Sequence, residues 1–267
     1  MTTEGTSDLR ITVIQSSLHW HQPDANRAMF EEKIWQANSK TDIIVLPEMF
    51  TTGFSMDAID LAETMNGPTH KWMKQIASQM DCCITGSIIC KENGNVYNRL
   101  LWVMPDGKTQ HYDKKHLFSM VGEDEKFSSG NDLLIVTYKG WRICPLICYD
   151  LRFPVWSRNV HDNQLVYDLL IYVANWPNAR IEAWETLLKA RAIENLSYCV
   201  GVNRIGEDGN NILYSGSSMV VSPKGKNIWY NNESEEIFET ELSYESLINF
   251  RKKFPAQLDA DKFTIIK

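Results

Sequence analysis

The sequence changes its pattern part-way along the chain, from alternating strand and helix signals to hairpin turns. Residues 43–46 form a continuous apolar run, which is typical of a strand covered on both faces. Helices are predicted on either side of this run, one capped by Asp24 and one over residues 70–80. Asn93-Gly94 then separates two strand-like runs, as in a β-hairpin. If strands and helices alternated along the whole chain, an eight-fold β/α barrel would be favoured. The hairpins break that alternation and favour a mixed-sheet α/β domain with helices on the outside.

The second half of the chain adds more strands and turns. Segments 105–108 and 223–226 both have the form Pro-x-Gly-Lys and are predicted as turns between strands. A helix predicted over residues 181–195 places Ile181, Trp184, Leu188 and Ala192 on one face. We expect one domain over residues 1–267, with the charged segment 250–267 as a C-terminal tail. Further strands are predicted at residues 9–15, 82–90, 133–136, 142–147, 168–173, 198–202 and 217–221.

Charge and composition limit the partners of this 267-residue chain. Its formal net charge of −7 argues against nucleic acid as the main partner. No apolar stretch reaches the length of about 18 residues that a membrane span needs, so we expect no membrane partner. The first eight residues lack the basic and apolar regions of a secretory signal, which favours a cytoplasmic protein. The cysteines form no Cys-x-x-Cys pair, so we expect reduced thiols and no zinc site.

Cys148 is the first candidate for chemistry. The predicted strand over residues 142–147 runs directly into it, and Pro154, a residue suited to the first turn of a helix, follows. At such a corner a helix N-terminus can lower the pKa of a thiol, and the thiolate is the nucleophilic form. The alternative is one more buried strand cysteine, and the position alone does not separate the two.

Two other charged sites complement a cysteine nucleophile. Glu48 lies just past a buried strand, where a carboxylate can serve as a proton shuttle, although an exposed loop glutamate is the commoner case. Lys114 and Lys115 follow a strand and point to opposite sides of an extended chain, so one can face a pocket. A lysine aimed at a developing oxyanion stabilises it in a dry site, whereas the alternative is a solvated basic patch.

Taken together, these segments resemble the nitrilase superfamily of carbon–nitrogen hydrolases, which uses a Glu-Lys-Cys triad. The motifs are Leu-Pro-Glu at residues 46–48, Tyr-Asp-Lys-Lys-His-Leu at 112–117 and Ile-Cys-Tyr-Asp-Leu-Arg-Phe-Pro at 147–154. The resemblance continues through segments 175–177, 190–195, 201–204 and 215–218. Within the superfamily the chain is most similar to the bacterial omega-amidase branch, through segments 174–177, 253–255 and 259–261.

This resemblance implies a fold and a reaction. The fold is an α/β four-layer α-β-β-α sandwich with mixed sheets, in a homodimer or larger homo-oligomer with residues 250–267 at the interface. The substrate is a small-molecule amide of the 2-oxoglutaramate or 2-oxosuccinamate type, hydrolysed to the oxo-acid and ammonia. Neither a metal nor an organic cofactor is implied.

The resemblance also assigns roles to individual residues. Cys148 attacks the amide carbon and forms a thioester, while Glu48 moves the protons. Lys114 and the backbone N–H of Tyr149 hold the oxyanion. The pattern Tyr-x-Lys-x-His-Leu selects Lys114 rather than its neighbour, although the family commonly has arginine where Asp113 stands.

Supporting and substrate-binding residues are predicted around this triad. Glu123 matches the second glutamate of the family, which positions the lysine, and Glu125 is its competitor. Arg152 and Arg180 are candidates for binding a substrate carboxylate, because a guanidinium can hold one in bidentate fashion. The remaining predicted pocket residues are Phe54 and Trp176.

Two kinds of alternative remain open from the sequence. A carbamoyl-amino-acid amidase or another small aliphatic amidase would use the same catalytic residues on a different substrate. A non-catalytic binding module or a thiol redox sensor would belong to another functional class. A Cys144–Cys148 bridge is excluded if both lie in one strand, because four residues then span about 13 Å.

Overall fold

The computed structural model describes residues 6–37 and 40–265. The first five residues of the segment that lacks signal-like features lie outside the described residues. The same holds for the last two residues of the predicted tail.

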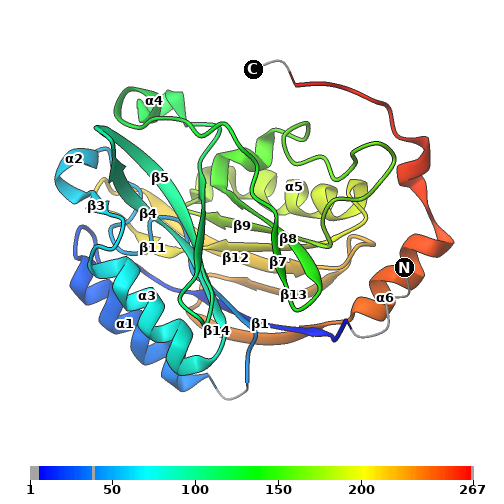
Figure 1. Cartoon of the computed structure of the whole chain (residues 1–267). Coiled ribbons are helices and arrows are strands. Elements are labelled where there is room, and N and C mark those ends of the chain that lie inside the picture. The colour runs from blue at the N-terminus through cyan, green and yellow to red at the C-terminus, as the bar shows by residue number, and fades with distance from the viewer. Residues whose placement is uncertain (1–5, 38–39, 266–267) are drawn as a thin grey trace.

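The described residues form two mixed β-sheets that pack face to face (Figure 1). In the first sheet the order is β14 (Glu236–Leu242), β1 (Leu9–Gln15), β2 (Ile43–Val45), β4 (Cys83–Glu92), β5 (Asn95–Val103) and β6 (Thr109–Asp113), with β3 (Glu63–Thr64) beside β4. In the second the order is β11 (Ile205–Glu207), β12 (Leu213–Val221), β10 (Tyr198–Asn203), β9 (Leu169–Ala174), β8 (Trp141–Ile147) and β7 (Val136–Tyr138), with β13 (Asn227–Asn232) beside β12.

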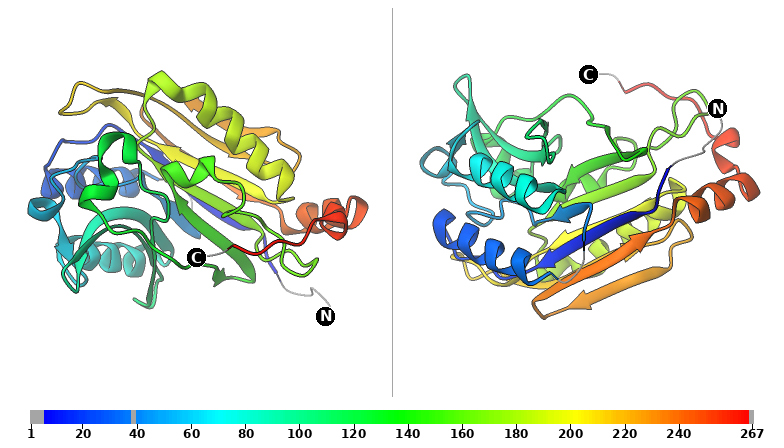
Figure 2. Two further views of the ribbon diagram at one scale, coloured as in Figure 1. Left: turned by 90° about the horizontal axis from the view of Figure 1, so that it is seen from above. Right: turned by 60° about the horizontal axis from the view of Figure 1, so that its bottom comes forward.

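Helices cover the outer face of each sheet. α1 (Pro23–Gln36) and α3 (Pro68–Met80) lie side by side on the first sheet, and α5 (Ile181–Glu194) lies on the second (Figure 2). This gives the layer order α-β-β-α and confirms the predicted sandwich. None of the helices built from the described residues combines the length and the apolar character needed to cross a bilayer. The shorter helices are α2 (Ala58–Leu61), α4 (Glu123–Lys126), α6 (Tyr244–Lys253) and the 3-10 turns η1 (Ser119–Val121), η2 (Cys148–Arg152), η3 (Asn178–Arg180) and η4 (Ala256–Asp259).

The apolar run at residues 43–46 explains why this architecture has buried layers on both sides of β2. Ile43 and Val45 lie in the core between the two sheets. Ile44 and Leu46 point the other way and pack with the inner faces of α1 and α3. Because successive side chains of a strand alternate between its faces, four apolar residues in a row predict a strand covered twice, and the structure confirms this.

Turn chemistry confirms one predicted hairpin and corrects a strand. Asn93 and Gly94 have φ values of 50° and 82° and join β4 to β5, as predicted. The strand predicted at residues 133–136 is wrong in position, because β7 begins only at Val136. Lys139 and Gly140, with φ of 48° and 82°, form a tight turn that pairs the residues just before and after it and so sets the register.

Helix boundaries agree in two cases and differ in a third. α5 buries Trp184, Leu188 and Ala192 on its predicted face, and α3 covers the range predicted for it. Asp24 does not cap α1, because Pro23 begins the helix and places Asp24 inside its first turn. There the carboxylate forms an ion pair with Arg27 rather than a cap.

Candidate active site

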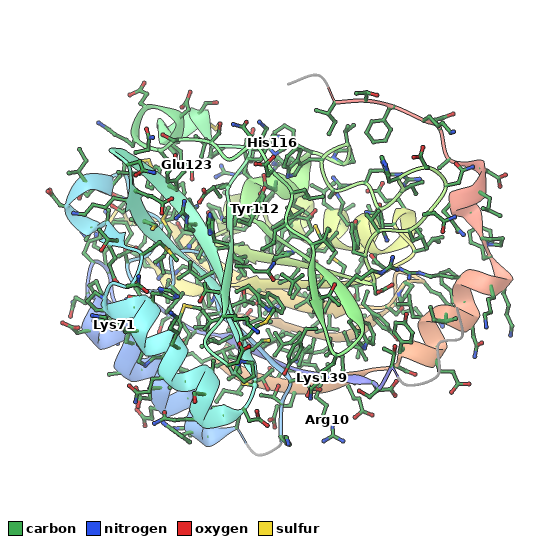
Figure 3. All side chains as sticks on the ribbon, in the orientation of Figure 1. Arg10, Lys71, Tyr112, His116, Glu123 and Lys139 are labelled. Carbon is green, nitrogen blue, oxygen red and sulfur yellow. The ribbon has the colours of Figure 1, made fainter. Side chains whose placement is uncertain are left out.

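One cavity lies where β2, β6, β8 and β9 end, at one edge of the two sheets. Strands that run parallel bring the side chains at their carboxyl ends to the same edge, and β8 and β9 are such a pair. In Figure 3, Tyr112, His116 and Glu123 lie toward this end of the molecule, opposite to Arg10 and Lys139. The lining residues are Phe54, Lys114, Phe118, Val121, Cys148, Tyr149, Arg152, Asn175, Trp176, Pro177, Arg180, Ile212 and Tyr214.

Cys148 begins the 3-10 turn η2 directly at the end of β8. Its φ of 41° lies in the left-handed region, a conformation that costs a non-glycine residue about 1–3 kcal/mol. The Asp150 carboxylate closes the turn by accepting a hydrogen bond from the Ile147 N–H at 3.1 Å. No helix begins at Pro154, contrary to prediction, because the chain from residue 154 to 157 continues as a turn.

Cys148 is buried, with only 8% of the residue exposed. Burial raises its pKa well above the ordinary value, and the charge of Glu48 acts in the same direction, while Lys114 opposes both. The thiol donates to the Asn175 carbonyl at 3.9 Å. The expectation that a helix N-terminus lowers this pKa is therefore wrong, because one 3-10 turn does not outweigh burial. The thiol is protonated at neutral pH and needs a base.

Glu48 is fully buried just past β2, where three donors hold its carboxylate. Oε1 accepts hydrogen bonds from Lys114 Nζ at 3.0 Å and from Asn98 Nδ2 at 2.8 Å. Oε2 accepts the backbone N–H of Asn175 at 2.8 Å, and the Asn175 side chain donates to the Glu48 carbonyl at 2.5 Å. The carboxylate is thus fixed in orientation beside the Cys148 thiol.

Lys114 lies between two buried carboxylates. Its Nζ donates to Glu123 Oε1 and Oε2, both at 2.9 Å, as well as to Glu48. Burial opposes the charge on the ammonium, but the two carboxylates outweigh it and raise the pKa of Lys114, so the group stays a cation. Lys115 points away and donates to Asn131 at the surface.

Glu123 is the glutamate that contacts the lysine, and Glu125 is exposed in solvent. Burial raises the pKa of Glu123, although Lys114 lowers it. Glu123 Oε2 also accepts the N–H of Phe118 at 2.6 Å, which ties the loop before η1 to the site.

The backbone around Lys114 is tightly packed. Gly130 donates its N–H to the Lys114 carbonyl at 3.0 Å, and a Cβ at Gly130 would lie 2.1 Å from the carbonyl oxygen of Asp113. Asp113 pairs with Arg99 through two hydrogen bonds of 2.7 and 2.9 Å. The residue that departs from the family pattern therefore has a charged partner on the neighbouring strand.

The predicted substrate-binding residues all line the cavity. Arg152 stacks over the Trp176 ring at 4.8 Å and Arg180 over Phe118 at 5.2 Å. Within residues 6–37 and 40–265, neither guanidinium forms an ion pair with a carboxylate. The centre of the Phe54 ring lies 5.1 Å from Lys114 Nζ, on the wall of the cavity.

Several site residues were outside the sequence prediction. Asn98 and Asn175 contact the triad, and Phe118, Ile212 and Tyr214 line the cavity. Asn98 carries one weak sequence signal, because it forms with Arg99 a polar pair directly before the apolar residues 100–103. Nothing in the local pattern indicates that it faces Glu48. Across the part of the chain that the structure describes, no group of three or more His, Cys, Asp or Glu side chains could hold a metal ion.

Comparison with known proteins agrees with this geometry. The family model for carbon–nitrogen hydrolases matches residues 10–252. Omega-amidase YafV of Escherichia coli K12 is 44% identical over 258 residues, covering 96% of this chain and 98% of the relative. The 2-oxoglutaramate amidase of Bacillus subtilis is 29% identical over 255 residues, covering 94% and 97%.

A solved structure extends the comparison to three dimensions. A CN-hydrolase superfamily protein of Xanthomonas campestris, crystallised with an arsenic adduct in its active site, superposes with a TM-score of 0.94. It is 46% identical, and the match covers 97% of this chain and 99% of that one. The chain belongs to the carbon–nitrogen hydrolase family, the nitrilase superfamily, in its omega-amidase branch.

Proposed function

We propose that this protein hydrolyses the terminal amide of a small oxo-acid amide, of the 2-oxoglutaramate or 2-oxosuccinamate type, to the oxo-acid and ammonia. One observation carries the proposal: the Cys148 thiol lies beside the Glu48 carboxylate and Lys114, at a cavity that is also lined by two guanidiniums without an ion-pair partner among the described residues. The names of the omega-amidase and 2-oxoglutaramate amidase relatives support the same substrate class.

The first half of the reaction forms a thioester. As the Cys148 sulfur bonds to the amide carbon, its proton passes to Glu48. The carbonyl oxygen becomes an oxyanion, which Lys114 Nζ and the N–H of Tyr149 stabilise. The C–N bond then breaks as Glu48 returns the proton to the departing nitrogen, which leaves as ammonia.

The second half frees the enzyme. Glu48, again a carboxylate, takes a proton from water as the water oxygen attacks the thioester carbon. The C–S bond breaks, the proton returns to the sulfur and the oxo-acid leaves. Glu123 keeps Lys114 charged and in place through both halves, because its carboxylate holds the ammonium with both oxygens.

Two arginines and two aromatic side chains of the cavity wall recognise the substrate. Arg152 and Arg180 bind the carboxylate at the far end of the substrate, since neither guanidinium has a hydrogen-bond partner among the described residues and each lies over an aromatic ring. Trp176 and Phe54 pack on the short carbon chain between that carboxylate and the amide.

Ammonia release from an amide panel tests the proposal. The wild-type protein should release ammonia from 2-oxoglutaramate faster than from a carbamoyl-amino acid or a neutral aliphatic amide. Cys148→Ala should abolish release, and mass spectrometry should detect an acyl adduct on Cys148 of the wild type. Faster turnover of the carbamoyl or neutral substrate would replace the substrate assignment, and no turnover of any amide would refute the enzyme activity.

We also propose that residues 1–267 act as one domain within a homo-oligomer, with the segment 250–267 at the interface. Phe254, Leu258 and Phe263 of this segment are exposed apolar side chains. Light scattering should give a mass at least twice that of the chain, and the variant Phe254→Glu, Leu258→Glu should lower it. A monomeric wild type would contradict this assignment.

A further inference from the structure

We propose that Asn98 is a positioning residue: its side-chain amide holds Glu48 so that Oε2 of that carboxylate, not Oε1, exchanges the proton with Cys148. The inference rests on the proposed function, because it concerns the proton that Glu48 carries. It adds a residue outside the triad and assigns the proton to one oxygen.

Asn98 reaches the site from the strand next to the edge strand β6 of the first sheet. It is fully buried on β5, where it pairs with Ile89 of β4. Its carbonyl accepts the N–H of Lys114 at 3.0 Å, so the same residue holds the backbone of the lysine. Its side chain then turns to Glu48. Asn98 thus sets the positions of the lysine and the carboxylate relative to each other.

The donors around Glu48 are divided unequally between its two oxygens. Oε1 accepts from both Lys114 and Asn98, at 3.0 and 2.8 Å. Among the residues that the structure describes, Oε2 accepts a single hydrogen bond, from the backbone N–H of Asn175 at 2.8 Å. A carboxylate offers about four lone-pair sites, two on each oxygen, so Oε1 is filled and Oε2 keeps one for the thiol proton.

The charges around Glu48 explain why a neutral amide, rather than a second cation, donates to its carboxylate. Glu48, Lys114 and Glu123 are all buried, which leaves two carboxylates around one ammonium. Asn98 Nδ2 lies 2.8 Å from Glu48 Oε1 and 3.4 Å from Glu123 Oε1, so it donates to both. A second cation here would bind the Glu48 carboxylate more tightly and weaken it as a base, whereas an amide supports it without removing its charge.

The other atom of the same amide argues against a role in stability. Asn98 Oδ1 is buried and has no hydrogen-bond partner among the described residues. An unpaired buried acceptor costs folding free energy. By contrast, the side-chain atoms of the buried Asn159 all have backbone partners, as expected for a structural asparagine. Asn98 is therefore explained by what its donors do for Glu48.

The test compares Asn98→Leu, Asn98→Asp and Asn98→Ser in ammonia release from 2-oxoglutaramate over a range of pH. Asn98→Leu has a similar volume and no donor, so kcat/KM should fall at least about tenfold. The acid limb of the kcat/KM profile should move to higher pH, because the negative charge at the site loses a hydrogen-bond donor. Four charged or titratable groups face Glu48 and can affect this pH profile: Lys114 after β6, Glu123 on α4, Cys148 on η2 and Tyr214 on β12.

The relative activities of the variants show whether Asn98 acts through its hydrogen-bond donor or only through its shape. Asn98→Asp keeps the shape but adds a carboxylate beside two others, so it should be the least active. Asn98→Ser keeps a donor and should exceed Asn98→Asp, a comparison that holds even if Asn98→Leu does not fold. The melting temperature of Asn98→Leu should stay within about 4 °C of the wild type, because an unpaired acceptor leaves with the amide.

Thr12→Val is the matched control, because Thr12 Oγ1 is also buried without a described partner in the same sheet. It should leave the rate and the pH profile unchanged. Wild-type kcat/KM and an unmoved acid limb in Asn98→Leu would overturn the inference, as would Asn98→Asp at or above Asn98→Ser. If the wild type releases no ammonia from any amide, the proposed function fails instead.

Discussion

The Asp150 carboxylate accepts a hydrogen bond from the Tyr112 hydroxyl at 2.8 Å, and this contact joins the strand that leads to Lys114 to the turn that carries Cys148. Asp150 Oδ2 also accepts the Ile147 N–H, and Oδ1 accepts the N–H of His116 at 3.0 Å and its Nδ1 at 2.8 Å. Burial and the charge of Asp150 raise the pKa of Tyr112, so its hydroxyl remains a donor. All four groups donate, and only a carboxylate can accept from all of them.

Asp150→Asn should therefore lower both activity and stability. The amide N–H₂ would face donors on one side, leaving at least one buried N–H unpaired at a cost of about 1–3 kcal/mol. The melting temperature should fall by about 2–6 °C. A shift of the turn relative to Lys114 should lower kcat at least about tenfold, because misplaced groups lose catalysis steeply. Thermal unfolding and ammonia release measure the two effects.

Asp106→Asn is the control for that variant, since Asp106 lies in an exposed turn and its carboxylate pairs with the neighbouring Lys108 and with no other described residue. It should behave as the wild type. An Asp150→Asn protein with unchanged kcat would contradict the view that this carboxylate aligns the two catalytic segments.

Arg152→Leu and Arg180→Leu should discriminate between charged and neutral substrates. Each guanidinium lines the cavity on an aromatic ring. Losing a charged hydrogen bond to the substrate carboxylate should lower kcat/KM for 2-oxoglutaramate about 10- to 100-fold. A neutral aliphatic amide has no carboxylate to lose, so its kcat/KM should change little. Equal losses on both substrates would assign these residues to the fold of the site rather than to recognition.

The sequence predicts where Glu48 and Cys148 lie in the fold better than it predicts which residues surround them, and the reason is physical. Glu48 and Cys148 each follow an apolar strand, and a reactive side chain at a strand end is visible in a local pattern. Asn98 contacts Glu48 only because β2 pairs with β4 and β4 pairs with β5, which brings together residues 50 positions apart. The sequence near Asn98 does not show how these strands align with one another, so the contact could not be predicted.

The same limit explains the two errors around the nucleophile. Pro154 suits a helix start, but Asp150 closes a tight turn before the chain reaches it. The pKa of Cys148 depends on burial by distant strands and on Glu48, so its direction could not be predicted from the corner alone.

The titration of Cys148 should respond in opposite directions to its two charged neighbours. The charge of Glu48 raises the pKa of the thiol and that of Lys114 lowers it. Glu48→Gln should therefore move the thiolate transition to lower pH, and Lys114→Met should move it to higher pH. Absorbance at the thiolate band, with Cys148→Ala subtracted, measures both. Shifts of the same sign would mean that a change in burial, rather than charge, dominates the site.

Away from the cavity, Glu235 makes the stability depend on pH. Its Oε2 accepts from Lys33 at 2.8 Å, and its Oε1 from Ser17 Oγ at 2.6 Å. Burial opposes ionisation, but the hydrogen bonds from Lys33 and Ser17 outweigh it and lower the pKa of Glu235 from 4.5 to about 2. Because the folded state holds the charged form, this stabilisation is complete above the unfolded pKa and is lost as pH falls from 4.5 toward about 2.

Glu235→Gln should lower the free energy of unfolding at pH 7 by less than about 1 kcal/mol, because the side chain is 42% exposed and solvent screens its charge. Urea unfolding at a series of pH values should bring the variant and the wild type together as the carboxyl becomes protonated. Glu233→Gln, at an exposed glutamate whose side chain makes no hydrogen bond to a described residue, should match the wild type throughout. If the difference in unfolding free energy between Glu235→Gln and the wild type stayed constant down to the lowest pH, packing rather than charge would explain the contribution of Glu235.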